Sequence, residues 1–144
     1  MFAVNVEGAI YKDGKWLVIE RGRKESHAAG ELALAGGKAE QEGHTTNLLE
    51  RTVKREIFEE VGLLVSDHMH YVRNTSFIAN GVHVVDIVFL CEYESGEAFN
   101  KSPDEVEAVF WMTTDEILQN PAAPIWLKDS IKQAELLRRS LEKI

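Results

Sequence analysis

Alternating hydrophobic residues at the start of the chain predict a β-hairpin. Phe2, Val4 and Val6 alternate with other positions, as in a strand with one buried face. An Asp-Gly turn at 13–14 then leads into the continuously apolar run 16–19, which is typical of a strand covered on both faces. We therefore expect a first hairpin whose second strand lies inside the sheet.

Residues 47–62 have the pattern of an amphipathic helix. Asn47 and Glu50 resemble a variant capping box at its start, and Gly62 supplies a stop signal at its end. Apolar residues recur every four positions between them: Leu49, Val53, Ile57 and Val61. This helix is expected to bury one face against the sheet.

The rest of the chain predicts a second hairpin, one more strand and two helices. Strand-like segments at 63–79 and 82–93 flank an Asn-Gly turn, and another strand follows at 108–112. Within the apolar run 84–91, Asp86 is interpreted as a satisfied structural partner rather than a substrate contact. Thr113 and Glu116 form a capping box for a short helix. A final helix carries an apolar stripe expected to pack within the domain or on a second copy: Leu127, Ile131, Ala134, Leu137 or Arg138, Leu141 and Ile144.

Three carboxylates in the central helix are the strongest candidates for chemistry. Glu56, Glu59 and Glu60 fall within one arc of roughly 100°, and Glu60 lies inside the apolar stripe. A carboxylate at a buried edge requires a cation, and Arg55 is expected on another face. Clustered carboxylate oxygens suit a hard cation such as Mg²⁺ or Mn²⁺. The alternative is a solvated acidic helix face.

These residues resemble a known sequence motif, the Nudix box, G-x5-E-x7-R-E-U-x-E-E-x-G-U, where U is a bulky aliphatic residue. Residues 55–63 match the second half of the motif at every fixed position. The first half departs, because 17 residues separate Gly37 from Arg55 where the motif has 13, and Asn47 stands where the motif has glutamate. Either Glu40 or Glu42 could replace that glutamate.

The resemblance implies an α/β fold, the Nudix fold, with a mixed β-sheet between α-helices and residues 1–144 as a single domain. It also implies a Mg²⁺-dependent hydrolase, with Mn²⁺ as the other candidate cofactor, acting on a nucleoside diphosphate linked to another group. The implied metal ligands are the Gly37 carbonyl with Glu56, Glu59 and Glu60, of which Glu59 binds directly or through water.

A further catalytic acid is expected from a late loop. In several Nudix enzymes such an acid lies about six residues before a strand tryptophan, and Trp111 places that position at Glu105. Asp104 and Glu107 are its rivals, and Glu56 is the alternative base. Arg21 and Lys38 are candidates for phosphate contacts. Arg21 is equally explained as a solvated loop residue, and a lone loop lysine such as Lys38 is more often simply solvated.

The net charge and the lengths of the apolar runs limit the classes of binding partner that we expect. A net charge of -8 over 144 residues disfavours a nucleic-acid surface, but small phosphorylated substrates remain open because a bound metal reverses the local charge. No apolar run is long enough for a membrane span, so we expect a cytoplasmic protein, monomeric or homodimeric, without a membrane partner. The single cysteine, Cys91, is interpreted as a buried core thiol.

The sequence leaves the substrate open among nucleoside triphosphates, including oxidised ones, nucleotide sugars, ADP-ribose and dinucleoside polyphosphates. Two other kinds of protein stay as alternatives. A nucleotide-sensing module without hydrolysis is favoured by Asn47 and opposed by the intact helix carboxylates. A cap-removing enzyme acting on nucleic acid is opposed by the negative charge and by the lack of a basic tail.

Overall fold

Two hairpins form most of the sheet in the computed structural model, which describes residues 1–25 and 28–143. The first joins β1 (Ala3–Lys12) to β2 (Lys15–Arg21), and the second joins β5 (Leu64–Ala79) to β6 (Val82–Ser95). Each turn has two consecutive residues with positive φ, at 13–14 and 80–81, as a two-residue type I′ turn requires. Both predicted hairpins are confirmed.

The hairpins meet in the middle of a mixed sheet. The strand order is β3-β2-β1-β6-β5, and β1 runs parallel to β6 while the other pairs are antiparallel. Three short strands complete the sheet, with β3 (Leu32–Ala33) and β7 (Val106–Met112) paired to β2, and β4 (Ala35–Lys38) paired to β1. The segment 32–38, which runs into the glycine pair, thus forms two short strands with different partners.

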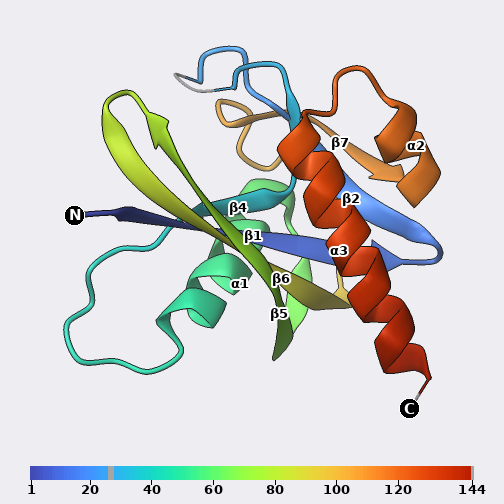
Figure 1. The fold of residues 1–144 in the computed structure, drawn as a ribbon, viewed down its shortest axis with the longest axis horizontal. Coiled ribbons are helices and arrows are strands. Elements are labelled where there is room, and N and C mark those ends of the chain that lie inside the picture. The colour runs from blue at the N-terminus through green and yellow to red at the C-terminus, as the bar shows by residue number, and fades with distance from the viewer. Residues whose placement is uncertain (26–27, 144) are drawn as a thin grey trace.

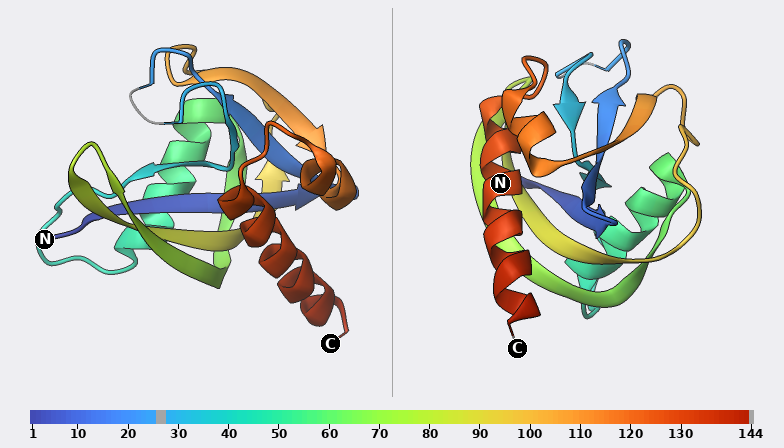
Figure 2. Two further views of the ribbon diagram at one scale, coloured as in Figure 1. Left: turned by 45° about the horizontal axis from the view of Figure 1, so that its top comes forward. Right: turned by 90° about the vertical axis from the view of Figure 1, so that its right-hand side faces the viewer.

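Helices cover both faces of this sheet. α1 (Leu48–Val61) lies on one side, and α2 (Thr114–Gln119) and α3 (Ile125–Glu142) lie on the other, as Figures 1 and 2 show. Two hydrophobic clusters fill the two interfaces, one including Val53 and Ile57 of α1 and one including Leu127 and Ile131 of α3. The predicted fold class, a mixed sheet between helices, is confirmed. Among the described residues, no helix is both long and apolar enough to cross a membrane.

Burial on both faces explains the uninterrupted apolar sequence of β2. Leu17 and Ile19 belong to the cluster under α1, whereas Trp16 and Val18 belong to the cluster under α3. All four side chains are at most 2% exposed. Successive residues of a strand point to opposite faces, so both sets must be apolar when both faces are covered. The stripe of α3 likewise packs within the domain, and Ile144 lies outside the described residues.

The predicted capping box at the start of α1 is wrong. Asn47 has φ 57° and ψ 35°, in the left-handed region, and its side chain makes no capping hydrogen bond. A capping side chain acts from an extended backbone, so the left-handed conformation turns the Asn47 side chain away from the first turn. Asparagine tolerates this conformation better than most residues, which accounts for its presence there.

The second predicted capping box, at the start of α2, is confirmed. The Thr113 hydroxyl accepts from the Glu116 amide at 3.1 Å, and the Glu116 carboxylate accepts from the Thr113 amide at 2.8 Å. The hydrogen bond from the Thr113 amide to the Glu116 carboxylate is the main cause that lowers the pKa of Glu116.

We expect Thr113→Ala to lower the free energy of unfolding by about 1 kcal/mol, the usual contribution of an N-cap. Because the pKa of Glu116 is lowered in the folded protein, its contribution is present above its unfolded pKa and lost as the pH falls. Urea unfolding of the wild type and Thr113→Ala at pH 7 tests the hydroxyl bond. The carboxylate bond comes from the backbone amide of residue 113, which Thr113→Ala keeps, so Glu116→Ala tests that bond. The difference between Glu116→Ala and the wild type should shrink at pH 3, and a difference that does not shrink would contradict the capping-box explanation.

Cys91 is a core residue, as the sequence predicts. Its side chain is 2% exposed within the cluster under α1. Burial raises the pKa of the Cys91 thiol to about 12, so the thiol stays protonated and unreactive at neutral pH.

Candidate active site

A glycine pair in β4 lies directly against two carboxylates of α1. The Gly36 amide donates a hydrogen bond to Glu60 Oε1 at 2.8 Å. A Cβ atom at Gly37 would come within 2.3 Å of Glu56 Cδ, and one at Gly36 would come within 2.0 Å of the Val6 carbonyl oxygen. Only glycines allow β4 to fit between β1 and the helix, which places the backbone of this pair beside Glu56 and Glu60.

Glu60 is a buried carboxylate surrounded by other acids. Glu60 is only 6% exposed. It lies on the apolar face of α1, as the sequence predicts. Burial, with smaller contributions from Glu105 and Glu56, raises the pKa of Glu60 to about 8 against the opposing effect of the Gly36 amide. The backbone amide therefore satisfies one oxygen without removing the electrostatic cost of the charged form.

Arg55 reaches the acidic face of the helix, contrary to expectation. Its Nη1 atom lies 3.5 Å from Glu56 Oε1 and 3.7 Å from Glu59 Oε1. The backbone position of Arg55 is on another face, but the long side chain bends back across the turn. Burial still raises the pKa of Glu56, although Arg55 opposes the shift. These long, partly exposed ion pairs contribute little and leave the carboxylates available.

The loop between β6 and β7 brings Glu105 to the same place. The Phe99 and Lys101 amides donate to the Val61 and Glu60 carbonyls at the end of α1, each at 3.0 Å. At the other end of the loop, the Gly22 amide donates to the Glu105 carbonyl at 2.8 Å. The last carbonyls of α1 thus anchor the loop, and Glu105 raises the pKa of both Glu56 and Glu60.

The structure separates the two acids of the loop before α1. Glu42 Oε1 accepts a hydrogen bond from Arg51 Nη2 at 2.7 Å, on the far side of the helix start. Glu40 instead acts on Glu56, whose pKa it raises. Of the two loop acids, Glu40 is therefore the one that interacts with the carboxylates of α1.

The chain matches the family model described as the NUDIX domain over residues 1–134. The protein belongs to the Nudix family. A crystal structure of a MutT NUDIX hydrolase from Burkholderia pseudomallei is similar at 32% identity and a TM-score of 0.77, over 92% of this chain and 98% of that chain.

Other solved structures share the fold at lower identity. A MutT protein from Methanosarcina mazei Go1 matches at 21% identity and a TM-score of 0.78, over 95% of each chain. The E. coli ORF135 protein matches at 23% identity and a TM-score of 0.71, over 96% of this chain and 92% of that chain. Among curated proteins, no significant match is found. The protein is accordingly a Nudix hydrolase, of a family that acts on nucleoside diphosphates linked to other groups.

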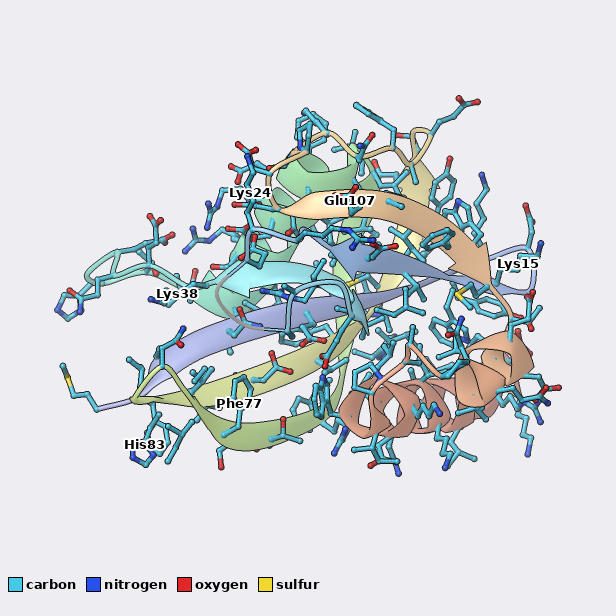
Figure 3. The ribbon with its side chains drawn as sticks, turned by 90° about the horizontal axis from the view of Figure 1, so that it is seen from above. Lys15, Lys24, Lys38, Phe77, His83 and Glu107 are labelled. Carbon is cyan, nitrogen blue, oxygen red and sulfur yellow. The ribbon has the colours of Figure 1, made fainter. Side chains whose placement is uncertain are left out.

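The two predicted phosphate contacts lie at different distances from the acids. Arg21, at the end of β2, acts on the pKa of both Glu60 and Glu7, and its Nη2 atom lies 3.5 Å from Glu25 Oε2. Lys38 is exposed at the end of β4, and Figure 3 shows it at the opposite end of the molecule from Lys15. Of these two cations, Arg21 is the one that lowers the pKa of Glu60.

A cavity lined partly by charged and amide side chains was not anticipated from the sequence. Asn5, Glu7, Arg21 and Asp86 line part of a cavity of about 320 Å³. Asn5 Nδ2 donates to Asp86 Oδ1 at 2.6 Å, so Asp86 has the structural partner that the sequence predicts, while its carboxylate keeps further capacity to accept hydrogen bonds. Burial, followed by Asp86 itself, raises the pKa of Glu7 well above its usual range. The available signal was the pair of polar residues, Asn5 and Glu7, that alternates with Val4 and Val6.

The donor set of the site fits a hard divalent cation of the kind Nudix hydrolases generally use. Among the described residues, no three acidic, histidine or cysteine side chains converge on one point, because Glu60 bonds the Gly36 amide and Glu56 faces Arg55. The raised pKa values of Glu56 and Glu60 show negative charge that is not fully compensated. A cation held by these oxygens would relieve that cost.

Proposed function

We propose that the protein hydrolyses a phosphoanhydride bond in a small nucleoside diphosphate derivative, with Mg²⁺ or Mn²⁺ as cofactor and residues 1–144 acting as one domain. The supporting observation is Glu60, a buried carboxylate of the Nudix helix that lies beside Glu56 and Glu105. Such an arrangement is costly for folding unless it serves a positively charged ligand.

In this proposal Glu56, Glu59, Glu60 and the Gly37 carbonyl hold the metal. A divalent cation, when bound, supplies positive charge that offsets the negative charge of the bridging phosphates. Arg21 and Lys38 bind phosphate oxygens through charged donors. These contacts orient the scissile bond at the end of α1.

The chain's own acids then carry the proton transfer. Glu105 accepts a proton from a water molecule as the water oxygen bonds to phosphorus, and the anhydride P–O bond breaks to release the leaving phosphate. Glu56 is the second candidate for the base, since it lies close to Glu105 and shares its electrostatic environment.

A hydrolysis screen tests the proposal. The protein would be incubated with nucleoside triphosphates, nucleotide sugars, ADP-ribose and dinucleoside polyphosphates, with Mg²⁺ or Mn²⁺, and the products separated by ion-exchange chromatography. We expect metal-dependent cleavage of at least one class, abolished by excess EDTA. Tight nucleotide binding without cleavage of any class would favour a sensing module instead.

Glu40 is expected to assist the site in place of the glutamate missing at Asn47. Because Glu40 acts on Glu56, Glu40→Gln should weaken metal binding or turnover by roughly 10-fold, the range for a group acting through a ligand. Glu42→Gln is the matched control in the same loop, since its carboxylate contacts Arg51. Measured kcat and metal dependence should change in the first variant only, and equal effects in both would contradict this assignment.

A further inference from the structure

The cavity beside Asp86 has a polar floor and an aromatic rim. Asn5 and Asp86 lie opposite each other in the register of β1 and β6, at the centre of the sheet. Phe77 of β5, labelled in Figure 3, and Trp126 at the start of α3 also line the cavity and are 38% and 49% exposed. Its volume, about 320 Å³, lies in the range of small-molecule sites. This shape suits a flat heteroaromatic ring whose face meets aromatic side chains and whose edge meets the floor.

The floor of the cavity consists of Asn5, Glu7 and Asp86, and these residues offer mainly hydrogen-bond acceptors. The lining also includes the donors Arg21 and Ser130. Asp86 and Glu7 are joined by a side-chain hydrogen bond, so the proton of that bond is used between the two carboxyl groups. The Asn5 side chain already donates an amide N–H to Asp86, and the Asn5 side-chain carbonyl oxygen takes no part in that bond. Carboxyl oxygens accept more than one hydrogen bond each, so the remaining capacity of the floor is to accept. Nearby, Arg73 favours the ionised form of Asp86 and donates to Ser130 Oγ at 3.1 Å.

Arg21 connects this cavity to the carboxylates of α1. It lines the cavity, and its charge acts on both Glu7 in the floor and Glu60 in the helix. A ligand with its ring in the cavity would therefore direct its phosphates past Arg21 towards Glu60. The cavity and the proposed hydrolytic site are two parts of one binding surface.

We infer that this cavity binds the base of the substrate and selects guanine, because Asp86 and its partners present acceptors to a base edge with adjacent N–H donors. The inference rests on the proposed function and names its substrate class, guanine nucleoside polyphosphates and their derivatives. Guanine carries a ring N–H beside an exocyclic amino group, which matches a carboxylate in a two-point contact.

The other common bases fit the floor less well. Adenine and cytosine place a ring nitrogen acceptor beside their amino group, and uracil places carbonyl oxygens on both sides of its N–H. Each of these acceptors would face an acceptor of Asp86 or Asn5 without a hydrogen bond. Burying an unpaired polar group is costly, so these bases should bind more weakly than guanine.

Direct binding of nucleoside monophosphates to the wild-type protein tests the inference without hydrolysis. Titration calorimetry without added metal would compare GMP with IMP, which lacks only the exocyclic amino group, and with AMP, CMP and UMP. We expect GMP to bind about 10- to 100-fold more tightly than IMP, the effect of one hydrogen bond to a charged group. Equal binding of GMP and IMP, or tighter binding of another base, would overturn the inference.

Two variants test whether the preference for GMP over IMP arises in this cavity. Asp86→Asn keeps the size of the side chain but turns one acceptor into a donor, so the ratio of GMP to IMP affinity should fall close to one. Asp67→Asn, an exposed carboxylate elsewhere on β5, is the control and should keep the ratio. If circular dichroism shows that Asp86→Asn is unfolded, Phe77→Ala takes its place, and should weaken GMP and IMP equally by about 10-fold or more through lost stacking.

The outcomes separate this inference from the proposed function. Hydrolysis of nucleotides without any difference between GMP and IMP would overturn the guanine assignment and leave the hydrolase intact. A preference for GMP that depends on Asp86, together with no nucleotide cleavage in the presence of Mg²⁺ or Mn²⁺, would support base binding in the cavity and overturn the proposed reaction. Unchanged GMP binding in both Asp86→Asn and Phe77→Ala would place the base elsewhere and overturn the inference.

Discussion

Replacing Glu60 with glutamine is expected to lower kcat by at least about 10²-fold while the fold is retained, because a lost metal ligand costs no less than a lost supporting group. Glutamine keeps an oxygen that can accept from the Gly36 amide, so the contact at 2.8 Å between β4 and α1 survives. Only the negative charge is removed. Steady-state hydrolysis and circular dichroism of the purified variant measure the two parts of the prediction.

Unfolding without metal adds a second test of the same substitution. Burial raises the pKa of Glu60 to about 8, so its protonated form favours the folded protein. Its contribution to stability is therefore complete below the unfolded pKa and is lost as the pH rises through about 8. Glu60→Gln should remove this part of the pH dependence and be no less stable than the wild type at pH 8.

Glu50→Gln is the matched control for Glu60→Gln on the same helix. Glu50 lies in the first turn of α1 and lines a separate hollow with Asp67 and His68. It should keep full activity and the same increase in melting temperature on adding Mg²⁺ as the wild type, whereas Glu60→Gln should lose that increase. Undiminished turnover of Glu60→Gln, or full wild-type activity in excess EDTA, would contradict a metal role for Glu60.

The elements that could be predicted from the sequence are those determined by local chemistry. The Asn80-Gly81 turn fixes its hairpin because both residues adopt positive φ, which few other pairs do without strain. The position of Glu60 on the buried face of α1 follows from helix geometry alone, and the structure confirms it. In both cases the pattern concerns residues that are neighbours in sequence and in space.

The features that the sequence did not reveal include contacts between distant segments and local conformations that depart from the usual pattern. Asn5 and Asp86 are 81 positions apart and meet only because β1 and β6 are parallel neighbours, a pairing that no local pattern predicts. The left-handed backbone of Asn47 was misinterpreted because an asparagine before a helix is usually an N-cap. Arg55 was misplaced because helix geometry fixes the Cβ direction and not the reach of a long side chain.

The site itself combines both kinds of information. The helix motif placed Glu56, Glu59 and Glu60 together, but the choice between Glu40 and Glu42 required the contact of Glu42 with Arg51. The position of Glu105 depended on backbone hydrogen bonds from its loop to the end of α1. The backbone contacts of this loop join residues more than 30 positions apart, so only the three-dimensional structure shows them.

Glu105→Gln is expected to lower kcat by about 10²-fold, with a smaller change in KM, as for a general base acting in the transition state. Glu105 is the acid of the late loop that acts on both Glu56 and Glu60. A carboxylate that binds a cation is a poorer base because the cation lowers its pKa, so an acid from outside the helix suits proton transfer better. Its carbonyl bond to the Gly22 amide is unaffected by the substitution, so the loop keeps its anchor.

Two substitutions in neighbouring positions separate this role from a general effect of charge. Glu97→Gln, in the same loop, and Glu107→Gln, on β7, each remove one negative charge and should change kcat by less than about threefold, since exposed residues away from a site have small effects. Stopped-flow measurement of a single turnover would show whether Glu105→Gln slows the chemical step. If all three variants show equal and small losses, the helix alone carries the chemistry, and Glu56 becomes the base that accepts the proton.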